Sequence, residues 1–269
     1  MLVRTLIMNE GVVMTATIRT REAQTMSIIR YATLALLISV LGAPPAWAQK
    51  LNYLSQVIDM PELIPPPPAP DTEAFEEDLA GVVEIQQNRT EAKVQRALAE
   101  KVLTIYQFTD VLGPKFNAKN LPVTDAFFQR MQADARTVLI AAKNAIQRPR
   151  PFAVSKLVQP LGGAPRLPTG YPSGGTIFIT STAILLAKMI PEKRYELHER
   201  SREIGLNRIM IGEHFPRDIR SGEIAATVIV YALMESPAFV RDFQETRAEL
   251  RQGLGYPAEP EAVGSAKPK

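Results

Sequence analysis

The sequence predicts an all-α protein, a single-domain helical bundle preceded by a proline-rich arm. Apolar residues recur at helical spacing through most of the chain, and capping residues and prolines separate the periodic segments. No alternating or β-branched run indicates a sheet. The chain has no cysteine, so disulfides cannot stabilise it and a packed core must do so.

The first 48 residues are typical of a secretory signal peptide rather than of a folded domain. Arg30 precedes an apolar stretch from Tyr31 to Leu41, and the small-residue pattern Ala46-Trp47-Ala48 follows it. Met26 lies just ahead of this signal and is an alternative start of translation. The apolar stretch is too short to span a bilayer. We therefore expect export, with no membrane insertion after the signal is cleaved.

The charge balance argues against nucleic-acid binding. The whole chain carries 31 Lys and Arg against 28 Asp and Glu. Residues 1–48 hold four arginines and two glutamates, which leaves 27 minus 26, or +1, for the remainder. No dense basic stripe with interleaved aromatic residues stands behind the basic pI, so a nucleic-acid partner is not expected.

The mature chain divides into an arm, a helical domain and a tail. Residues 49–70 are expected to form an extended arm, because Pro65-Pro66-Pro67-Pro68 favours the polyproline conformation. The helical domain is expected at residues 71–252 and a flexible tail at residues 253–269.

Helices are expected wherever caps and helical periodicity coincide. Thr124 opens a strongly amphipathic helix that should carry Lys143 at its end, and Thr176 to Met189 is apolar enough to be a buried central helix. The other expected helices are Asp71 to Gln87, Thr90 through Ile105 to about Leu112, Glu192 to about Ile209, Arg217 to Met234, and Pro237 to Arg251 with Ser236 as its cap.

Three segments, far apart in sequence, carry side chains that suit one phosphate pocket. They are Lys143 with Arg150-Pro151, then Pro172-Ser173-Gly174-Gly175, then Arg208 with His214 and Asp218. Arginine and lysine offer fork and point-charge donors to a dianionic phosphoryl group, the Ser-Gly-Gly turn offers backbone N–H groups, and histidine can attack phosphorus. The combination indicates phosphoryl transfer.

The spacing resembles that of a known family. The pattern consists of a lysine, six residues and Arg-Pro, then Pro-Ser-Gly, then an arginine, five residues, a histidine, three residues and an aspartate. It is similar to that of the type 2 phosphatidic acid phosphatase (PAP2) superfamily, specifically the class A bacterial non-specific acid phosphatases. The likeness runs from about residue 52 to 250 and includes the proline arm and Ser236-Pro237-Ala238-Phe239. It implies an all-helical, periplasmic phosphomonoesterase without metal or cofactor, often homodimeric, with a pocket shared with vanadium haloperoxidases.

The resemblance also implies a role for each site residue. His214 is the expected nucleophile and Asp218 the group that fixes its tautomer. The expected phosphate-binding residues are Lys143, Arg150, Ser173, Gly174, Gly175 and Arg208. No metal ligand is expected. Arg148 is expected to face solvent or a carboxylate, and Glu213 to point away from the pocket.

Two positions depart from the family pattern. Asn207 stands where the family has serine, which affects how Arg208 is positioned. Gly175 stands where the family has the histidine that protonates the leaving group. General acid catalysis contributes about 10²- to 10⁴-fold, so its loss should matter for alkyl esters and much less for phenolic ones. His198 and Tyr171 are weak candidates for a replacement acid.

The sequence therefore predicts an exported, periplasmic acid phosphatase that hydrolyses small-molecule phosphate monoesters through a phosphohistidine. Inorganic phosphate is its other expected ligand, and Gly175 makes the enzyme slow or selective for good leaving groups. One alternative is a degenerate homologue that binds phosphate without turnover. A vanadate-dependent peroxidase is less favoured, because that chemistry also uses the missing histidine. Lipid phosphatase activity is disfavoured, since no transmembrane helix is predicted after the signal.

Overall fold

The computed structural model describes residues 51–163, 165 and 167–258. The predicted signal peptide and the end of the predicted tail lie outside this range. Within it the regular structure is helical, and the one β-bridge joins Pro149 and Thr169. The helices are α2 (Glu73–Gln87), α3 (Glu91–Ala99), α4 (Thr109–Leu112), α5 (Pro122–Ile146), α6 (Pro151–Val154), α7 (Gly174–Met189), α8 (Arg194–Met210), α9 (Pro216–Met234) and α10 (Pro237–Leu254), with 3₁₀ turns η1 (Met60–Glu62), η2 (Ile105–Phe108) and η3 (Pro191–Lys193).

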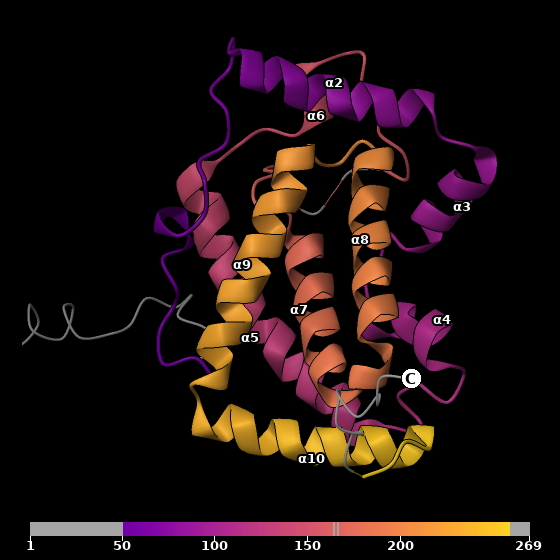
Figure 1. Ribbon diagram of the computed structural model, residues 1–269. Coiled ribbons are helices and arrows are strands. Elements are labelled where there is room, and N and C mark those ends of the chain that lie inside the picture. The colour runs from indigo at the N-terminus through magenta and orange to yellow at the C-terminus, as the bar shows by residue number, and fades with distance from the viewer. Residues whose placement is uncertain (1–50, 164, 166, 259–269) are drawn as a thin grey trace, which may run out of the picture. The chain divides into compact units, whose positions relative to one another are not determined.

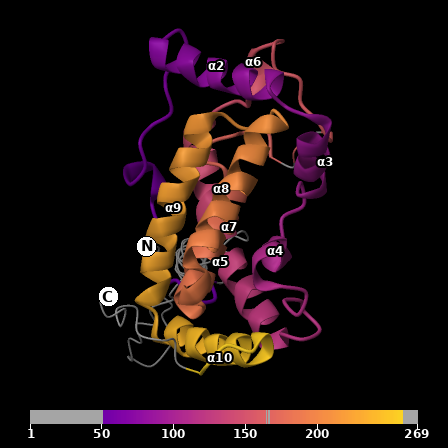
Figure 2. The same ribbon diagram turned by 45° about the vertical axis from the view of Figure 1, so that its right-hand side comes forward.

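Helix α7 is the central helix of the bundle, as its composition predicts. It packs against α8, α9 and α5 (Figure 1). Most of its side chains are buried. Helices α2 and α10 lie across opposite ends of these helices (Figures 1 and 2). Because α7 begins with Gly174 and Gly175, the apolar composition that buries it also fixes the predicted phosphate-binding turn within the bundle.

Helix α5 ends where the prolines require it to end. Its apolar face is buried through Phe127, Phe128 and Met131, and its last residue is Ile146, followed by Gln147 in the left-handed region. Proline disfavours the helical conformation of the residue before it, which explains the stop ahead of Pro149. Lys143 is therefore held in the final turn of a rigid, packed helix.

One acidic residue of α5, Asp134, is buried, although an amphipathic helix ordinarily carries its charges on the exposed side. The carboxylate of Asp134 accepts the backbone N–H groups of Asn52, Tyr53 and Leu54 at 2.7 to 3.0 Å. These bonds pin the start of the described chain to α5. A buried carboxylate with such donors is satisfied, and its burial carries no unpaired charge.

The single helix expected from Thr90 to about Leu112 is wrong. Helix α3 ends at Ala99, and the chain restarts at η2 and α4. A capping box formed by Thr104 and Gln107 begins a new element, which outweighs the helical periodicity of this stretch. The break turns residues 101–103 toward the predicted site, where they line a cavity.

Candidate active site

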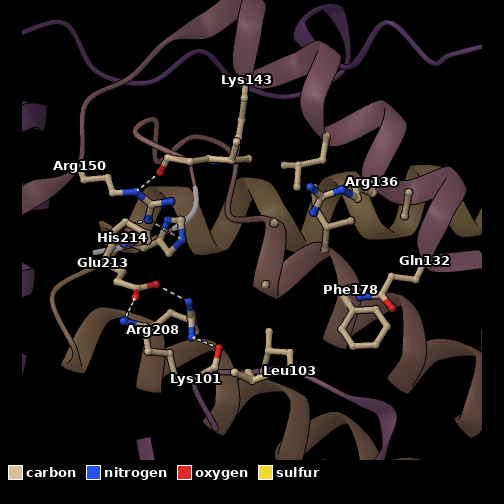
Figure 3. A pocket seen from close by; sticks show the side chains of 18 of the residues that line it. Lys101, Leu103, Gln132, Arg136, Lys143, Arg150, Phe178, Arg208, Glu213 and His214 are labelled. Atoms are coloured by element: carbon tan, nitrogen blue, oxygen red, sulfur yellow. Dashed lines mark hydrogen bonds and ion pairs between the residues drawn. The ribbon is translucent and has the colours of Figure 1, made fainter. Parts of the chain in front are cut away.

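The three predicted segments meet at one pocket. A cavity of about 530 Å³ is lined by Lys143, Arg150 and Arg208, by Gly174 and Gly175, and by His214 (Figure 3). Two predicted residues lie behind this lining rather than in it. Ser173 and Asp218 are fully buried and do not line the cavity.

His214 is held so that one ring nitrogen faces the cations. It precedes α9, and its Nδ1 lies 3.2 Å from Asp218 Oδ2, four residues away. Since the carboxylate can only accept, Nδ1 donates and Nε2 keeps its lone pair. Nε2 lies 3.3 Å from Arg150 Nη1. Burial lowers the pKa of His214 to about 4, against the opposing effect of Asp218. The imidazole is therefore a neutral base at mildly acidic pH.

Asp218 is fixed by more than the histidine. Its Oδ2 also accepts the Phe215 backbone N–H at 3.0 Å, and its Oδ1 accepts Arg148 Nη1 at 2.7 Å. Burial alone would raise the pKa of Asp218, but the His214 hydrogen bond and Arg148 lower it below its usual value. Asp218 is thus an ionised carboxylate aimed at the imidazole.

Arg148 lies in the supporting layer behind the site. The expectation that it faces a carboxylate is confirmed, and its alternative, solvent, is wrong because the side chain is buried. Its guanidinium bridges Asp218 and Asp78 of α2, each at 2.7 Å, and stacks over the Phe215 ring at 3.9 Å. The sequence gives no sign of this role, since Asp78 lies on a helix far from the motifs.

Lys143 and Arg150 are buried cations with backbone acceptors. Lys143 Nζ donates to Thr169 O at 2.8 Å, and burial, aided by the charge of Arg150, lowers its pKa to about 7. Arg150 donates to Leu167 O at 2.9 Å and to Glu213 O at 2.8 Å. No carboxylate within the described chain pairs with either side chain. Two buried positive charges without counter-ions suit an anionic ligand.

Ser173 acts here as the N-cap of α7. Its Oγ accepts the Thr176 N–H at 3.3 Å and the Thr176 hydroxyl at 2.9 Å. At Gly174 a Cβ would lie 2.3 Å from Leu139 Cδ2, so the end of the Leu139 side chain would have to move if this residue had a side chain. The first N–H groups of a helix have no partner within it and favour an anion. The turn therefore offers main-chain donors to the cavity, while the hydroxyl of Ser173 is engaged at the cap.

Gly175 leaves a space that a neighbour partly fills. A Cβ built at this position would lie 2.9 Å from Leu103 Cδ1 and 3.4 Å from Arg208 Nε. Leu103 comes from the break after α3, which the sequence analysis took for helix. Position 175, where the resemblance implies an acid, is thus flanked here by a leucine and by a guanidinium.

Glu213 lines the cavity, and the expectation that it points elsewhere is wrong. Its carboxylate pairs with Arg208 Nη2 and lies 3.2 Å from Lys101 Nζ. Arg208 also donates to Lys101 O at 3.3 Å, while its buried Nε has no hydrogen-bond partner in the described part of the chain. The adjacency of Glu213 to His214 was the one available sequence signal for this residue, and Lys101 had none.

Neither candidate for a replacement acid reaches the cavity. The Tyr171 hydroxyl contacts Pro65 O and Ser221 Oγ, and burial raises its pKa. His198 lies on α8, ten residues before Arg208, which is about 15 Å along a helix. Asn207 donates to Glu100 at 2.7 Å, away from the cavity. The protein therefore has no evident histidine or tyrosine donor at the leaving-group position among the described residues.

Neither a metal centre nor a membrane-spanning helix is evident within the same range. No three His, Asp or Glu side chains of residues 51–163, 165 and 167–258 converge to hold a metal ion. No single described helix is long and apolar enough to cross a bilayer, although α9 and α10, bent by 100° at their junction, meet the length and composition criteria as a pair.

Comparisons with known proteins agree with the motif. Residues 133–241 match the model of the PAP2 superfamily. The non-specific acid phosphatase of Salmonella typhi is 28% identical over 195 residues, covering 70% of this chain and 78% of that protein. That of Providencia stuartii is 27% identical over 210 residues, covering 74% and 85%. An acid phosphatase of Zymomonas mobilis is 35% identical over 82 residues, covering 30% and 31%.

Among solved structures, a transmembrane PAP2 type phosphatidylglycerolphosphate phosphatase from Bacillus subtilis aligns with a TM-score of 0.44 and 16% identity. The alignment covers 61% of this chain and 87% of that one. The PAP2 superfamily model therefore matches the segment from within α5 to the start of α10, which bears the site. The sequence relatives of this chain include the bacterial non-specific acid phosphatases.

Proposed function

We propose that the protein is an acid phosphatase that hydrolyses phosphate monoesters through a phosphohistidine at His214. The observation that carries the proposal is the neutral imidazole, held on one side by Asp218 and facing Arg150 on the other, in a cavity lined by cations. The relatives named as acid phosphatases support the same activity.

Substrate binding uses Lys143 and Arg150, which no carboxylate of the described residues pairs with, together with Arg208, which also contacts Glu213. The phosphoryl oxygens lie against Lys143, Arg150 and Arg208 and against the first N–H groups of α7. These donors neutralise the dianion and stabilise the charge that spreads over the equatorial oxygens in the transition state.

The first chemical step is in-line attack by His214 Nε2. Its lone pair forms a P–N bond while the P–O bond to the leaving group breaks, and the bonding electrons depart on that oxygen. The imidazole keeps its proton on Nδ1, and Asp218 stabilises the positive ring that results. Water then attacks phosphorus, the P–N electrons return to Nε2, and the water proton passes to solvent.

The charge states of two groups favour acidic conditions. His214, with a pKa of about 4, is neutral and nucleophilic above that pH. Lys143, with a pKa of about 7, keeps its positive charge below that pH. Both requirements hold between about pH 4 and 7, which is the range of an acid phosphatase.

Trapping the intermediate tests the nucleophile. The chain has two histidines, so His198→Ala is a matched control for His214→Ala. With a labelled aryl phosphate, the wild type and the His198 variant should give an acid-labile, base-stable phosphoenzyme. The His214 variant should give none and should lose on the order of 10³-fold or more in kcat. A phosphoenzyme in the His214 variant refutes the assignment.

A second candidate function is phosphate binding without turnover, and Gly175 is the observation that favours it. If no aryl phosphate reacts but inorganic phosphate raises the melting temperature, the binding function replaces the enzymatic one. A vanadate-dependent peroxidase is less favoured, because it uses the same missing histidine. Its test is halide oxidation with peroxide and vanadate.

Export to the periplasm belongs to the same proposal. It rests on the signal-like pattern of residues 1–48, which lie outside the described residues. Cell fractionation of a tagged chain should find it in the periplasm with a new N-terminus at Gln49. A homodimer, free of nucleic acid, is the proposed assembly, and light scattering of the purified protein measures it.

A further inference from the structure

The cavity is larger than a phosphate needs, and one end of it takes no part in the chemistry proposed above. At about 530 Å³ it lies in the size range of pockets for whole small molecules. The end opposite His214 is lined by Gln132, Arg136 and Phe178 (Figure 3). Leu103 and Leu139 also line the cavity.

Helix α5 joins the two ends of the cavity. Gln132, Arg136, Leu139 and Lys143 follow one another at spacings of four, three and four residues, which places them on one helix face. Seven residues separate Arg136 from Lys143, or about 10 Å along the helix axis. A molecule with its phosphate at Lys143 can therefore lie along this face and reach Arg136 with its other end.

Arg136 differs from the other cations of the cavity. It is exposed and points toward the cavity without any hydrogen bond or ion pair to the described residues (Figure 3). Arg208 and Lys101, in contrast, both contact Glu213. Gln132, one turn before Arg136, is likewise exposed and free of such contacts. This end of the cavity thus presents an available guanidinium and an available amide.

The geometry of the reaction determines what lies there. In phosphoryl transfer the attacking and leaving groups are roughly in line with phosphorus. His214 lies at one end of the cavity and Arg136 at the other, so the leaving group departs toward Leu103, Phe178 and Arg136 (Figure 3). The leaving group therefore first meets apolar side chains and then a positive charge.

We propose that this end of the cavity is a leaving-group subsite for aryl phosphates that bear a carboxylate. The ring packs against Leu103 and Phe178, and Arg136 pairs with the carboxylate, with Gln132 beside it. The inference rests on the proposed function and narrows it. An aryl oxide departs without prior protonation, so this substrate class suits a site that has Gly175 in place of an acid.

A pair of matched substrates tests the subsite. Phenyl phosphates with a para carboxymethyl or carbamoylmethyl group differ in charge, while the methylene keeps their phenol acidities similar. Wild type should favour the carboxylate by roughly three- to tenfold in kcat/KM. Arg136→Gln should abolish that preference by lowering kcat/KM for the carboxylate substrate. Arg241→Gln, an exposed arginine of α10 away from the cavity, is the control and should keep it.

Binding of non-hydrolysable benzylphosphonates with the same two substituents separates the subsite from the activity. If no aryl phosphate turns over, the proposed function fails. The subsite stands if calorimetry on the full chain shows tighter binding of the carboxylate in wild type but not in Arg136→Gln. Equal binding of the two phosphonates by wild type, an unchanged preference in the variant, or no phosphonate binding overturns it.

Discussion

Replacing Gly175 with histidine introduces the proton donor that the resemblance implies at this position. The backbone there is the first turn of α7, which a histidine adopts without strain. The added Cβ would lie 2.9 Å from Leu103 Cδ1, so the end of one half-buried leucine must move. We expect a cost of about 1 kcal/mol in folding, at the low end for overpacking.

The expected gain in rate follows from where the imidazole of Gly175→His would lie. The Cβ position is 3.4 Å from Arg208 Nε, beside the proposed phosphate. An imidazole there can protonate the leaving oxygen, which is worth about 10²- to 10⁴-fold, or roughly 3 to 5 kcal/mol. Alkyl phosphates, whose alkoxides leave poorly, should gain about 10²-fold or more. Aryl phosphates should change by less than about threefold.

The assay is kcat/KM over a series of phosphate esters of rising leaving-group pKa. The wild type should show a steep decline and Gly175→His a shallow one. Gly175→Ala is the matched control, since it adds the same Cβ without a proton donor, and Leu103→Ala in addition relieves the contact. A shallow decline already present in the wild type would refute the reasoning, because another group would then be supplying the proton.

Two further predictions concern the layer behind the site and the pH range. Arg148→Met leaves the buried carboxylates of Asp78 and Asp218 without their shared cation. The free energy of unfolding, measured by urea denaturation, should fall by about 3 to 5 kcal/mol. A loss below about 1 kcal/mol would contradict the stabilising role of this bridge. For an aryl phosphate, kcat/KM should rise through about pH 4 as His214 loses its proton and fall through about pH 7 as Lys143 loses its charge. Lys143→Arg should remove the upper limb, and a profile that still falls near pH 7 assigns that limb to another group.

Local signals were sufficient for most helices because caps and breakers act within one turn. Thr72, Thr90 and Ser236 cap the helices that were expected at these positions. Helix α5 ends at Ile146, shortly before Pro149, as the prolines predicted. The error after Ala99 shows the limit of periodicity. Helical spacing persisted there, but the capping box at Thr104 began a new element and the chain turned inward.

The site shows the same division between local and tertiary information. Lys143, Arg150, Arg208 and His214 carried a spaced motif and do share one cavity. Lys101 and Arg136 carried no such signal, since their place depends on which segments pack beside the motif, and Glu213 had only its adjacency to His214. For Arg148 the sequence left solvent or a carboxylate open, and its two carboxylates, Asp218 and Asp78 of α2, could not be known before the fold brought them together.

The absence of a proton donor at Gly175 and the proposed leaving-group subsite favour the same class of substrate. An enzyme that protonates its leaving group accepts many alcohols, since the acid compensates for a poor one. On the proposed function, a site with Gly175 favours substrates whose oxygen leaves unaided, and contacts with the leaving group would add to that preference. Leu103, which closes the space beside Gly175, also lines the path toward Arg136. Leu103, which lies beside the position where the resemblance implies an acid, is therefore also part of the surface that would contact an aryl leaving group.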